Sequence, residues 1–167
     1  MLEIINDLES FFKDNYRKIH VREYAKILKI SPPTASKILE NYFKEQLLKK
    51  EIDKQYYYYS ANRDSYIFRD LQRIYWKEQL KELIRTIRED CLTPTIILFG
   101  STAKAEIKKD SDIDITILTV SKINIDLDRF EKKLKKKIQL FHFNNIDEVS
   151  EELKHNILNG YILEGTL

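Results

Sequence analysis

The sequence is poor in cysteine, glycine and proline, with one, three and three of them among its 167 residues. A single cysteine, Cys91, excludes an internal disulfide framework and is typical of a reducing cytoplasm. No apolar run is long enough to span a membrane, and residues 1–7 are acidic and amphipathic rather than a secretion signal. We therefore expect a cytoplasmic protein with no membrane partner.

The composition that is present indicates a globular protein. Apolar residues make up 43% of the chain and charged residues 34%, which suits a packed core beneath a well-solvated surface. The length fits one domain or two small ones. No internal repeat or low-complexity segment interrupts it.

An apolar stretch from residue 94 to residue 99 ends in Gly100 and Ser101. We expect a strand followed by a sharp turn, because glycine lets the backbone turn tightly and approach a ligand closely. Ser101 offers a hydroxyl where a helix can begin, and the free N–H groups at the start of a helix suit phosphate. The alternative is a plain strand-to-helix turn.

Polar and apolar residues nearly alternate from residue 112 to residue 118, which is the period of a half-buried strand. Asp112 and Asp114 then share one face. Two such carboxylates raise each other's pKa unless a cation lies between them. Mg²⁺ fits this geometry, since it takes few protein carboxylates and completes its shell with water and phosphates. The alternative is an exposed acidic face on an edge strand.

Together these segments carry a resemblance. Residues 99–106 read FGSTAKAE and residues 110–114 read DSDID. They resemble the signature of the DNA polymerase β-like nucleotidyltransferases, above all the minimal nucleotidyltransferases of archaea and bacteria. The similarity is close over residues 95–118 and loose over the rest of the C-terminal half. It implies a small α/β domain with a mixed sheet that uses Mg²⁺ and a nucleoside triphosphate, with ATP expected.

The resemblance also implies roles for single residues. The phosphate turn of the family maps onto Gly100 and Ser101, with Lys104 as a further nucleotide-binding residue. Its first two metal ligands, which are also catalytic, map onto Asp112 and Asp114. Many members have glycine where this chain has Ala105, so we expect a differently shaped loop.

The third carboxylate of the family is expected on the next strand, for which Lys137 to Phe143 is the candidate. Its inward polar position is Gln139, which is neutral. This change removes the base that would activate an attacking hydroxyl and the charge that would hold a second metal. Asp147 and Glu148 follow, but they could substitute only by reaching back, and acidic residues commonly cap helix starts.

The N-terminal part has a different pattern. Helical spacing predicts helices over residues 2–13 and 21–28, and a third from Pro32 to about Gln46 with Ser31 as its N-cap. Residues 47–50 and 55–60 then read as a hairpin. In its four tyrosines, strand alternation predicts one pair in the core and one pair as cover. This order resembles the winged helix-turn-helix domain of prokaryotic regulators.

The charge of this part agrees with a nucleic-acid partner. Between residues 17 and 63, 11 Lys or Arg outnumber 5 Asp or Glu, a net charge of +6 against +2 for the whole chain. A basic helix-turn-helix is typical of binding to double-stranded DNA. Four exposed residues are expected to face base edges, and Lys54 a phosphate. The four are Pro33, Thr34, Ser36 and Lys37. The alternative is a three-helix packing module with a solvated basic face.

We therefore expect an α+β chain in three segments: a winged helix-turn-helix over 1–61, a connecting helix over 62–92 and a minimal nucleotidyltransferase-like domain over 93–167. Apolar stripes over residues 62–90 fit one long helix or two abutting ones, which could cover the nucleotidyltransferase sheet, pair with their copy in a homodimer, or both. We expect a homodimer, because winged-helix proteins commonly bind two half-sites as dimers. The lysines of residues 132–137 lie on a further helix, either as a solvated face or as a surface for nucleic acid or triphosphate.

Two functions remain open. The first is metal-dependent transfer of a nucleotide, expected to be AMP, to a hydroxyl of a protein or another acceptor. Small nucleotidyltransferases of this type resemble antitoxins that modify a partner toxin. The second is a DNA-binding regulator whose nucleotidyltransferase domain only binds nucleotide or is catalytically degenerate.

Overall fold

The computed structural model describes residues 3–167 and divides into two compact units. The first unit comprises the chain up to Gln72 together with Ala105–Lys109, and the second comprises Arg73–Lys104 and Asp110–Leu167. Leu2, expected at the start of the first helix, lies outside the described residues. Across those residues, no helix combines the length and the apolar character that crossing a membrane requires.

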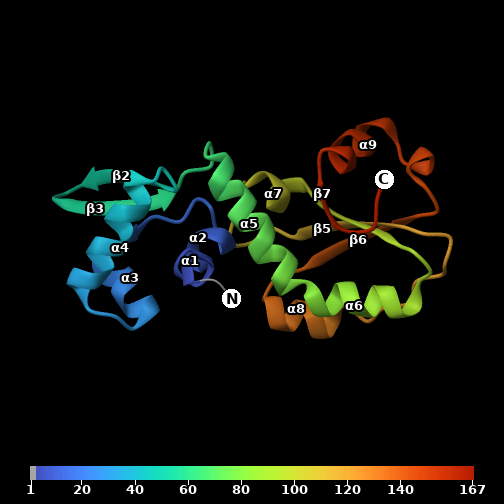
Figure 1. Cartoon of the computed structure of the whole chain (residues 1–167), viewed down its shortest axis with the longest axis horizontal. Helices are drawn as coiled ribbons and strands as arrows, with labels where there is room; N and C mark the ends of the chain where they lie inside the picture. Colours follow the sequence, from blue (N-terminus) through green and yellow to red (C-terminus); the bar gives the residue numbers. More distant parts are fainter. Residues whose placement is uncertain (1–2) are drawn as a thin grey trace. The chain divides into compact units, whose positions relative to one another are not determined.

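Four helices form most of the first unit (Figure 1). They are α1 (Glu3–Asp7), α2 (Glu9–Lys13), α3 (Val21–Leu28) and α4 (Pro32–Lys44). The expected helix over residues 2–13 is interrupted at Leu8, which is fully buried between α1 and α2. The Ser31 hydroxyl caps α4 by accepting from the Thr34 N–H at 3.3 Å, and prolines occupy the first turn, as the sequence predicts.

A small antiparallel sheet completes this unit. Its strands are β1 (Ile19–His20), β2 (Leu48–Asp53) and β3 (Tyr56–Ala61), in the order β1-β3-β2. The hairpin between β2 and β3 turns at Lys54 and Gln55, both with positive φ. Of the four tyrosines on β3 only Tyr59 is buried, whereas Tyr56 and Tyr57 are exposed, so the predicted core pair is wrong.

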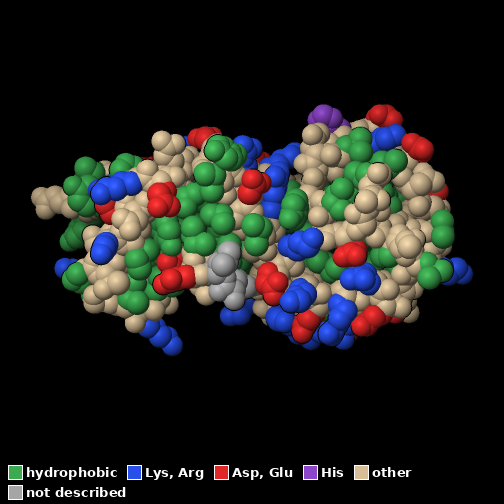
Figure 2. Space-filling view, viewed as in Figure 1, with side chains coloured by type: hydrophobic (Ala, Val, Ile, Leu, Met, Phe, Trp, Pro, Cys, Tyr) green, Lys and Arg blue, Asp and Glu red, His purple; other side chains and the backbone are tan. Residues whose placement is uncertain are grey.

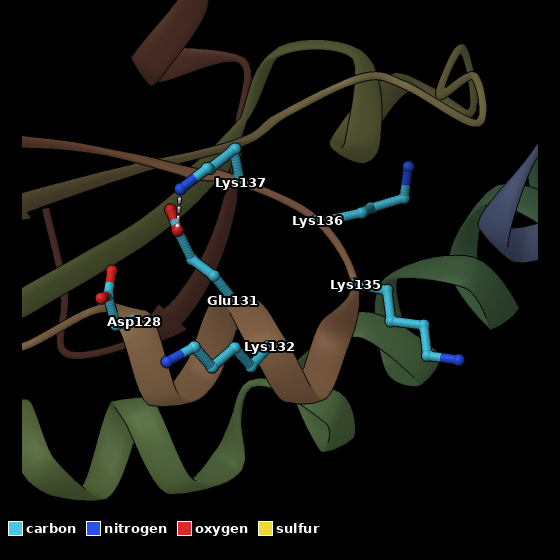
Figure 3. A pocket seen from close by; sticks show the side chains of 6 residues that line it. All are labelled: Asp128, Glu131, Lys132, Lys135, Lys136 and Lys137. Atoms are coloured by element: carbon cyan, nitrogen blue, oxygen red, sulfur yellow. Dashed lines mark hydrogen bonds and ion pairs between the residues drawn. The ribbon is translucent and has the colours of Figure 1, made fainter.

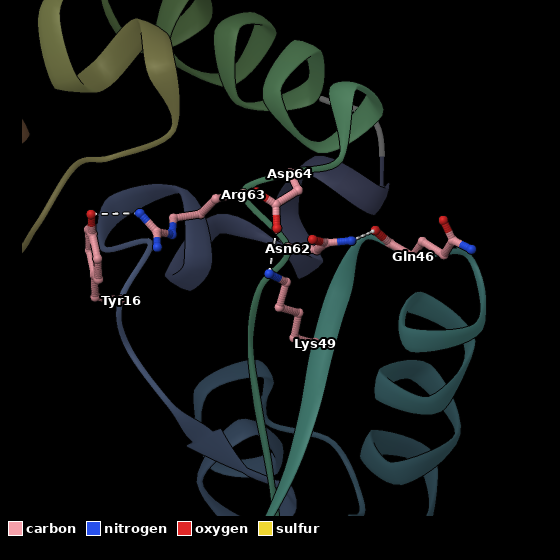
Figure 4. A network of polar contacts seen from close by, with 6 residues as sticks. All are labelled: Tyr16, Gln46, Lys49, Asn62, Arg63 and Asp64. Carbon is pink, nitrogen blue, oxygen red and sulfur yellow. Dashed lines mark hydrogen bonds and ion pairs between the residues drawn. The ribbon is translucent and has the colours of Figure 1, made fainter.

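Polar contacts fix the chain as it leaves this hairpin (Figure 4). The Asn62 amide donates to the Gln46 carbonyl at 2.7 Å, and Lys49 pairs with Asp64 at 2.6 Å. Arg63 donates to the Tyr16 hydroxyl at 2.6 Å, with its guanidinium 4.2 Å from the centre of that ring. Both ends of the hairpin are thereby held to the body of the first unit.

Two abutting helices follow, α5 (Tyr66–Gln79) and α6 (Lys81–Asp90), separated only by Leu80. This arrangement decides between the two helical alternatives of the sequence. The division between the two compact units falls within α5.

The second unit contains a four-stranded sheet. Its strands are β4 (Thr95–Phe99), β5 (Ile113–Leu118), β6 (Ile138–Phe143) and β7 (Tyr161–Glu164), in the order β6-β5-β4-β7. The pair β5–β6 is parallel and the other two pairs are antiparallel, so the sheet is mixed, as expected.

The other helical segments of this unit are α7 (Gly100–Lys104), α8 (Asp128–Leu134), a 3₁₀ turn (Ile146–Glu148) and α9 (Glu151–Leu158). Figure 1 shows α9 on one side of the sheet and α6 with α8 on the other. Ile157 of α9 packs on Ile97 and Phe99 of β4 in a buried cluster. On the same face of the sheet, Asp114 lies near the beginning of β5, and Asp112 directly precedes the strand.

The segment Ala105–Lys109 follows α7 but belongs to the first unit. Asn15, which is 2% exposed, forms two hydrogen bonds with the backbone of Ile107. Its backbone N–H donates to the Ile107 carbonyl, and its side-chain Oδ1 accepts from the Ile107 N–H, both at 2.9 Å. Its Nδ2 donates to Gln72 Oε1 at 2.5 Å and to the Phe11 carbonyl at 2.8 Å. Every polar group of this buried side chain is therefore satisfied.

Candidate functional site

The turn after β4 and the start of β5 meet at Gly100. Phe99 is the register partner of Asp114, and Gly100 follows with φ +66. A Cβ built on Gly100 would lie 2.1 Å from Asp114 Oδ2. The carboxylate therefore occupies the space above the glycine, and a side chain at residue 100 would displace it. Glycine is needed here for its backbone conformation and for this close approach.

The two aspartates form an electrostatically strained pair. Burial raises the pKa of the Asp114 carboxyl above its ordinary value of 3.8, and the neighbouring charge of Asp112 raises that pKa further. Both effects disfavour the ionised carboxylate. A cation bound between the two carboxylates would relieve them.

Gln139 stands on the neighbouring strand at the position expected for a third carboxylate. It is the register partner of Asp114, and its Nε2 donates to Asp112 Oδ2 at 3.2 Å. Within residues 3–167, no group of three or more His, Cys, Asp or Glu side chains is arranged to hold a metal ion. The chain thus supplies two carboxylates and one amide at this point.

This donor set fits one hard cation better than two. Mg²⁺ is commonly held by one or two carboxylates, with substrate phosphates and water as its other ligands. A second ion would need further negative charge, which an amide does not provide. Asp147 and Glu148 lie beyond the opposite end of β6, where they contact Lys154 at 3.2 Å and Asn144 at 2.7 Å.

The other residues predicted for the nucleotide lie along α7. Ser101 is half-buried beside Gly100 at the start of this five-residue helix. Lys104 is exposed at its end, and its Nζ donates to Asn156 Oδ1 at 3.0 Å. Ala105 follows, fully buried and left-handed with φ 57, a conformation that costs alanine roughly 1–2 kcal/mol. Gly100, Asp112, Asp114 and Gln139 are thus brought together, and Lys104 contacts α9.

The sequence predicts the lysines of residues 132–137 on one helix, but Lys136 and Lys137 follow the end of α8 and lie near the aspartates. Lys136 Nζ donates to the carbonyl of Ser111 at 3.2 Å, and the Lys137 carbonyl accepts from the Ile113 N–H at 2.9 Å. Their place beside β5 follows from the parallel β5–β6 pairing. That pairing is a long-range contact, which helical spacing over residues 132–137 does not predict.

The residues predicted for DNA lie on the surface of the first unit. Pro33, Thr34, Ser36 and Lys37 are exposed along the N-terminal half of α4, and Lys54 is exposed at the hairpin turn. No ion pair among the described residues holds either of these two lysines.

Other cations of this unit are neutralised internally, so the net charge of the sequence overstates what a ligand would meet. Lys50 pairs with Glu40 at 2.7 Å and stacks 4.1 Å from the centre of the Tyr57 ring. Lys18 pairs with Glu51.

Comparison with known protein families gives one match. Residues 78–164, slightly more than half of the chain, match the family described as Polymerase beta, Nucleotidyltransferase. The matched region runs from the end of α5 to β7 and contains Gly100, Asp112, Asp114 and Gln139. Neither the curated proteins nor the solved structures provide a match to this chain.

Proposed function

This chain belongs to the polymerase beta nucleotidyltransferase family, and from this we propose that its second unit binds ATP together with one Mg²⁺ at Asp112 and Asp114. The observation that carries the proposal is the contact between the phosphate turn and the strand, where Gly100 leaves room for the Asp114 carboxylate. A nucleotidyltransferase domain implies a nucleoside triphosphate substrate. The choice of ATP and the residue roles are part of the proposal.

Each residue has a distinct part in this proposal. Asp112 and Asp114 would hold the metal, which when bound supplies positive charge against the phosphates. The Gly100 backbone and the Ser101 hydroxyl would bind the β- and γ-phosphates, with Lys104 close by on α7. Gln139 would orient Asp112 through its amide hydrogen bond.

The reaction that this site favours is transfer of AMP to an acceptor hydroxyl. The hydroxyl oxygen would bond to the α-phosphorus, and the bond from that phosphorus to pyrophosphate would break. The hydroxyl proton would pass to water, because the amide of Gln139 cannot accept it. We therefore propose slow transfer by this chain, with a partner protein, as in antitoxin-like modification of a toxin, among the acceptors.

The metal part is tested by thermal unfolding of the full chain with and without Mg²⁺ and ATP. A ligand that binds only the folded state stabilises it and so raises the melting temperature. At a ligand concentration of 100 times the dissociation constant, the stabilisation is about 2.7 kcal/mol. Asp112→Asn combined with Asp114→Asn should abolish this rise. Asp110→Asn removes an exposed acid just before β5 and should keep it. An unchanged rise in the double variant would contradict the proposal.

A second candidate function is a DNA-binding regulator, supported by the first unit. Its helices α3 and α4, the capped turn between them and the β2–β3 hairpin follow the order of a winged helix-turn-helix. We propose that α4 faces double-stranded DNA through the exposed residues at its start, with Lys54 at a phosphate. Such proteins commonly bind two half-sites, so a homodimer is part of this proposal. In it, the second unit binds nucleotide without efficient transfer.

A further inference from the structure

A pocket of about 430 Å³ lies between α8 and the beginning of β6 in the second unit (Figure 3). This volume falls within the range of small-ligand sites. Four lysines and two acidic residues line it: Asp128, Glu131, Lys132, Lys135, Lys136 and Lys137. Figure 2 shows Lys and Arg side chains, interspersed with acidic ones, over α6 and α8.

The end of α8 accounts for how these lysines are presented. Lys135 adopts a left-handed conformation with φ 54 and closes the helix, since its N–H donates to the Glu131 carbonyl. The chain then turns directly into β6. Cations near a helix C-terminus stabilise the helix, which is a structural reason for Lys132 and Lys135 alone. It does not account for Lys136 and Lys137, which follow the helix.

The negative charge of the pocket is partly used within it. One oxygen of Glu131 accepts from Lys137 at 2.5 Å, and the other accepts from the Ile138 N–H at 2.9 Å. Throughout residues 3–167, Lys132 and Lys135 form no ion pair. Both ammonium groups are therefore available to pair with a phosphate.

The pocket borders the candidate site on the side away from the phosphate turn. In the sheet, β5 lies between β4, which leads into Gly100, and β6, which the lysines precede in the chain. Lys136 Nζ donates to the Ser111 carbonyl at 3.2 Å, immediately before Asp112. A nucleoside triphosphate held at Gly100 leaves the β6 side of the aspartates for the acceptor.

We propose that the α8–β6 pocket binds phosphate groups of the acceptor, so that an acceptor hydroxyl reaches Asp112 and Asp114 from the β6 side. The phosphates belong either to the end of a nucleic-acid chain or to a phosphorylated small molecule, which share this chemistry. The inference rests on the proposed function, because it assumes that a nucleotide is transferred at these aspartates.

The test measures binding of a fluorescent single-stranded RNA oligonucleotide to the full chain as salt is varied. All proteins carry Lys37→Ala and Lys54→Ala, which remove the proposed duplex contacts. Lys132→Gln with Lys135→Gln is compared with Lys133→Gln. The last replaces a lysine of the same helix that pairs with Glu82 at 2.8 Å and does not line the pocket.

Counterion release sets the expected size of the effect. Each phosphate contact on a single strand contributes about −0.7 to the slope of log affinity against log salt. Loss of two contacts should flatten the slope by about 1.4 and weaken binding by about 25-fold at 100 mM salt and about tenfold at 200 mM salt. Lys133→Gln should stay within about twofold of its parent, since it removes no phosphate contact. Equal effects of both variants, or none, would overturn the proposal.

Two further measurements separate the remaining outcomes. If pyrophosphate or a mononucleotide displaces the RNA at equal phosphate concentration, the acceptor is a small phosphorylated molecule. If neither displaces it, the acceptor is the end of a nucleic-acid chain. The Lys132/Lys135 variant should keep the Mg²⁺–ATP rise in melting temperature. Loss of that rise would place the triphosphate in the pocket and overturn the inference. Persistence of the rise after Asp112→Asn with Asp114→Asn would instead refute the proposed function.

Discussion

Replacement of Gln139 by aspartate should place a third carboxylate next to Asp112 and Asp114. Gln139 Nε2 lies 3.2 Å from Asp112 Oδ2 in the protein, so the new charge would fall within a few ångströms of both aspartates. Two unit charges about 4 Å apart repel by about 1 kcal/mol in water and about 4 kcal/mol at an effective dielectric constant of 20. Because Gln139 is exposed, we expect about 1–2 kcal/mol of lost stability without metal, or roughly 2–8 °C in melting temperature.

Magnesium should reverse this loss and make the variant the better enzyme. With Mg²⁺ present, the metal offsets the repulsion among the three carboxylates, and the new carboxylate can take the proton of an attacking hydroxyl. General-base catalysis is typically worth ~100- to 10,000-fold, so transfer of labelled AMP should rise well above wild type. Gln139→Glu tests the same charge on a longer side chain. Gln139→Ala is the control, because it removes the amide hydrogen bond without adding charge.

Three results would refute this reasoning. If Gln139→Asp melts like wild type without metal and gains nothing from magnesium, residue 139 is not at the metal position. If wild type transfers AMP rapidly and loses this activity on changing Asp147 or Glu148, the third carboxylate lies there. If all forms bind nucleotide and none transfers it to any acceptor tried, a neighbouring-gene product included, the unit is a binding module.

Three further predictions concern other features. Gly100→Ala should lower stability by at least about 1 kcal/mol, because φ is positive, and should abolish the Mg²⁺–ATP shift in melting temperature by displacing Asp114. Gly165→Ala is the control: Gly165 also has a positive φ, but a Cβ there would lie 2.7 Å from the Pro94 carbonyl oxygen at the other end of β4, so this variant should lose stability and keep the shift. Without metal, the contribution of Asp114 to stability should fall as pH rises from 3.8 toward its raised pKa in the folded state, because the folded state holds the Asp114 proton more tightly than the unfolded state does. The stability difference between wild type and Asp114→Asn should therefore change over this pH range, and a constant difference would contradict the raised pKa. The affinity for duplex DNA should decrease as salt rises, with a slope of about −0.9 per phosphate contact, and Lys54→Ala should flatten the slope by about that amount. Lys37→Ala, at a residue proposed to face base edges, should weaken binding; no duplex binding by folded protein at low salt would exclude the regulator.

Local signals account for the parts of the structure that could be predicted. Alternation over residues 112–118 indicated β5 and put both aspartates on one face, and the serine cap with its prolines fixed the start of α4. The position of Gln139 followed from the period of the next strand, which the β5–β6 register matches. Such patterns depend only on neighbours a few residues away, so the sequence displays them directly.

Long-range contacts account for the rest. Alternation shows which face of a strand a tyrosine occupies, but not whether another element covers that face; Tyr57 is exposed beside Lys50, whereas Tyr59 is buried. The short strands β1 and β7 have no pattern of their own and exist through pairing with β3 and β4. The lysines of the α8–β6 pocket come near the aspartates only through a parallel crossover.

The hydrogen bonds between Asn15 and Ile107 bear on how this protein can be divided or recombined. The polypeptide passes from one compact unit to the other after Gln72, back after Lys104 and out again after Lys109. A fragment that begins at Arg73 would therefore retain Ala105–Lys109 but leave the Ile107 amide and carbonyl without Asn15. Grafting a different N-terminal unit onto this nucleotidyltransferase would also need a substitute for Asn15. Fusion proteins should therefore keep the two units together, and activity should be assayed on the intact chain.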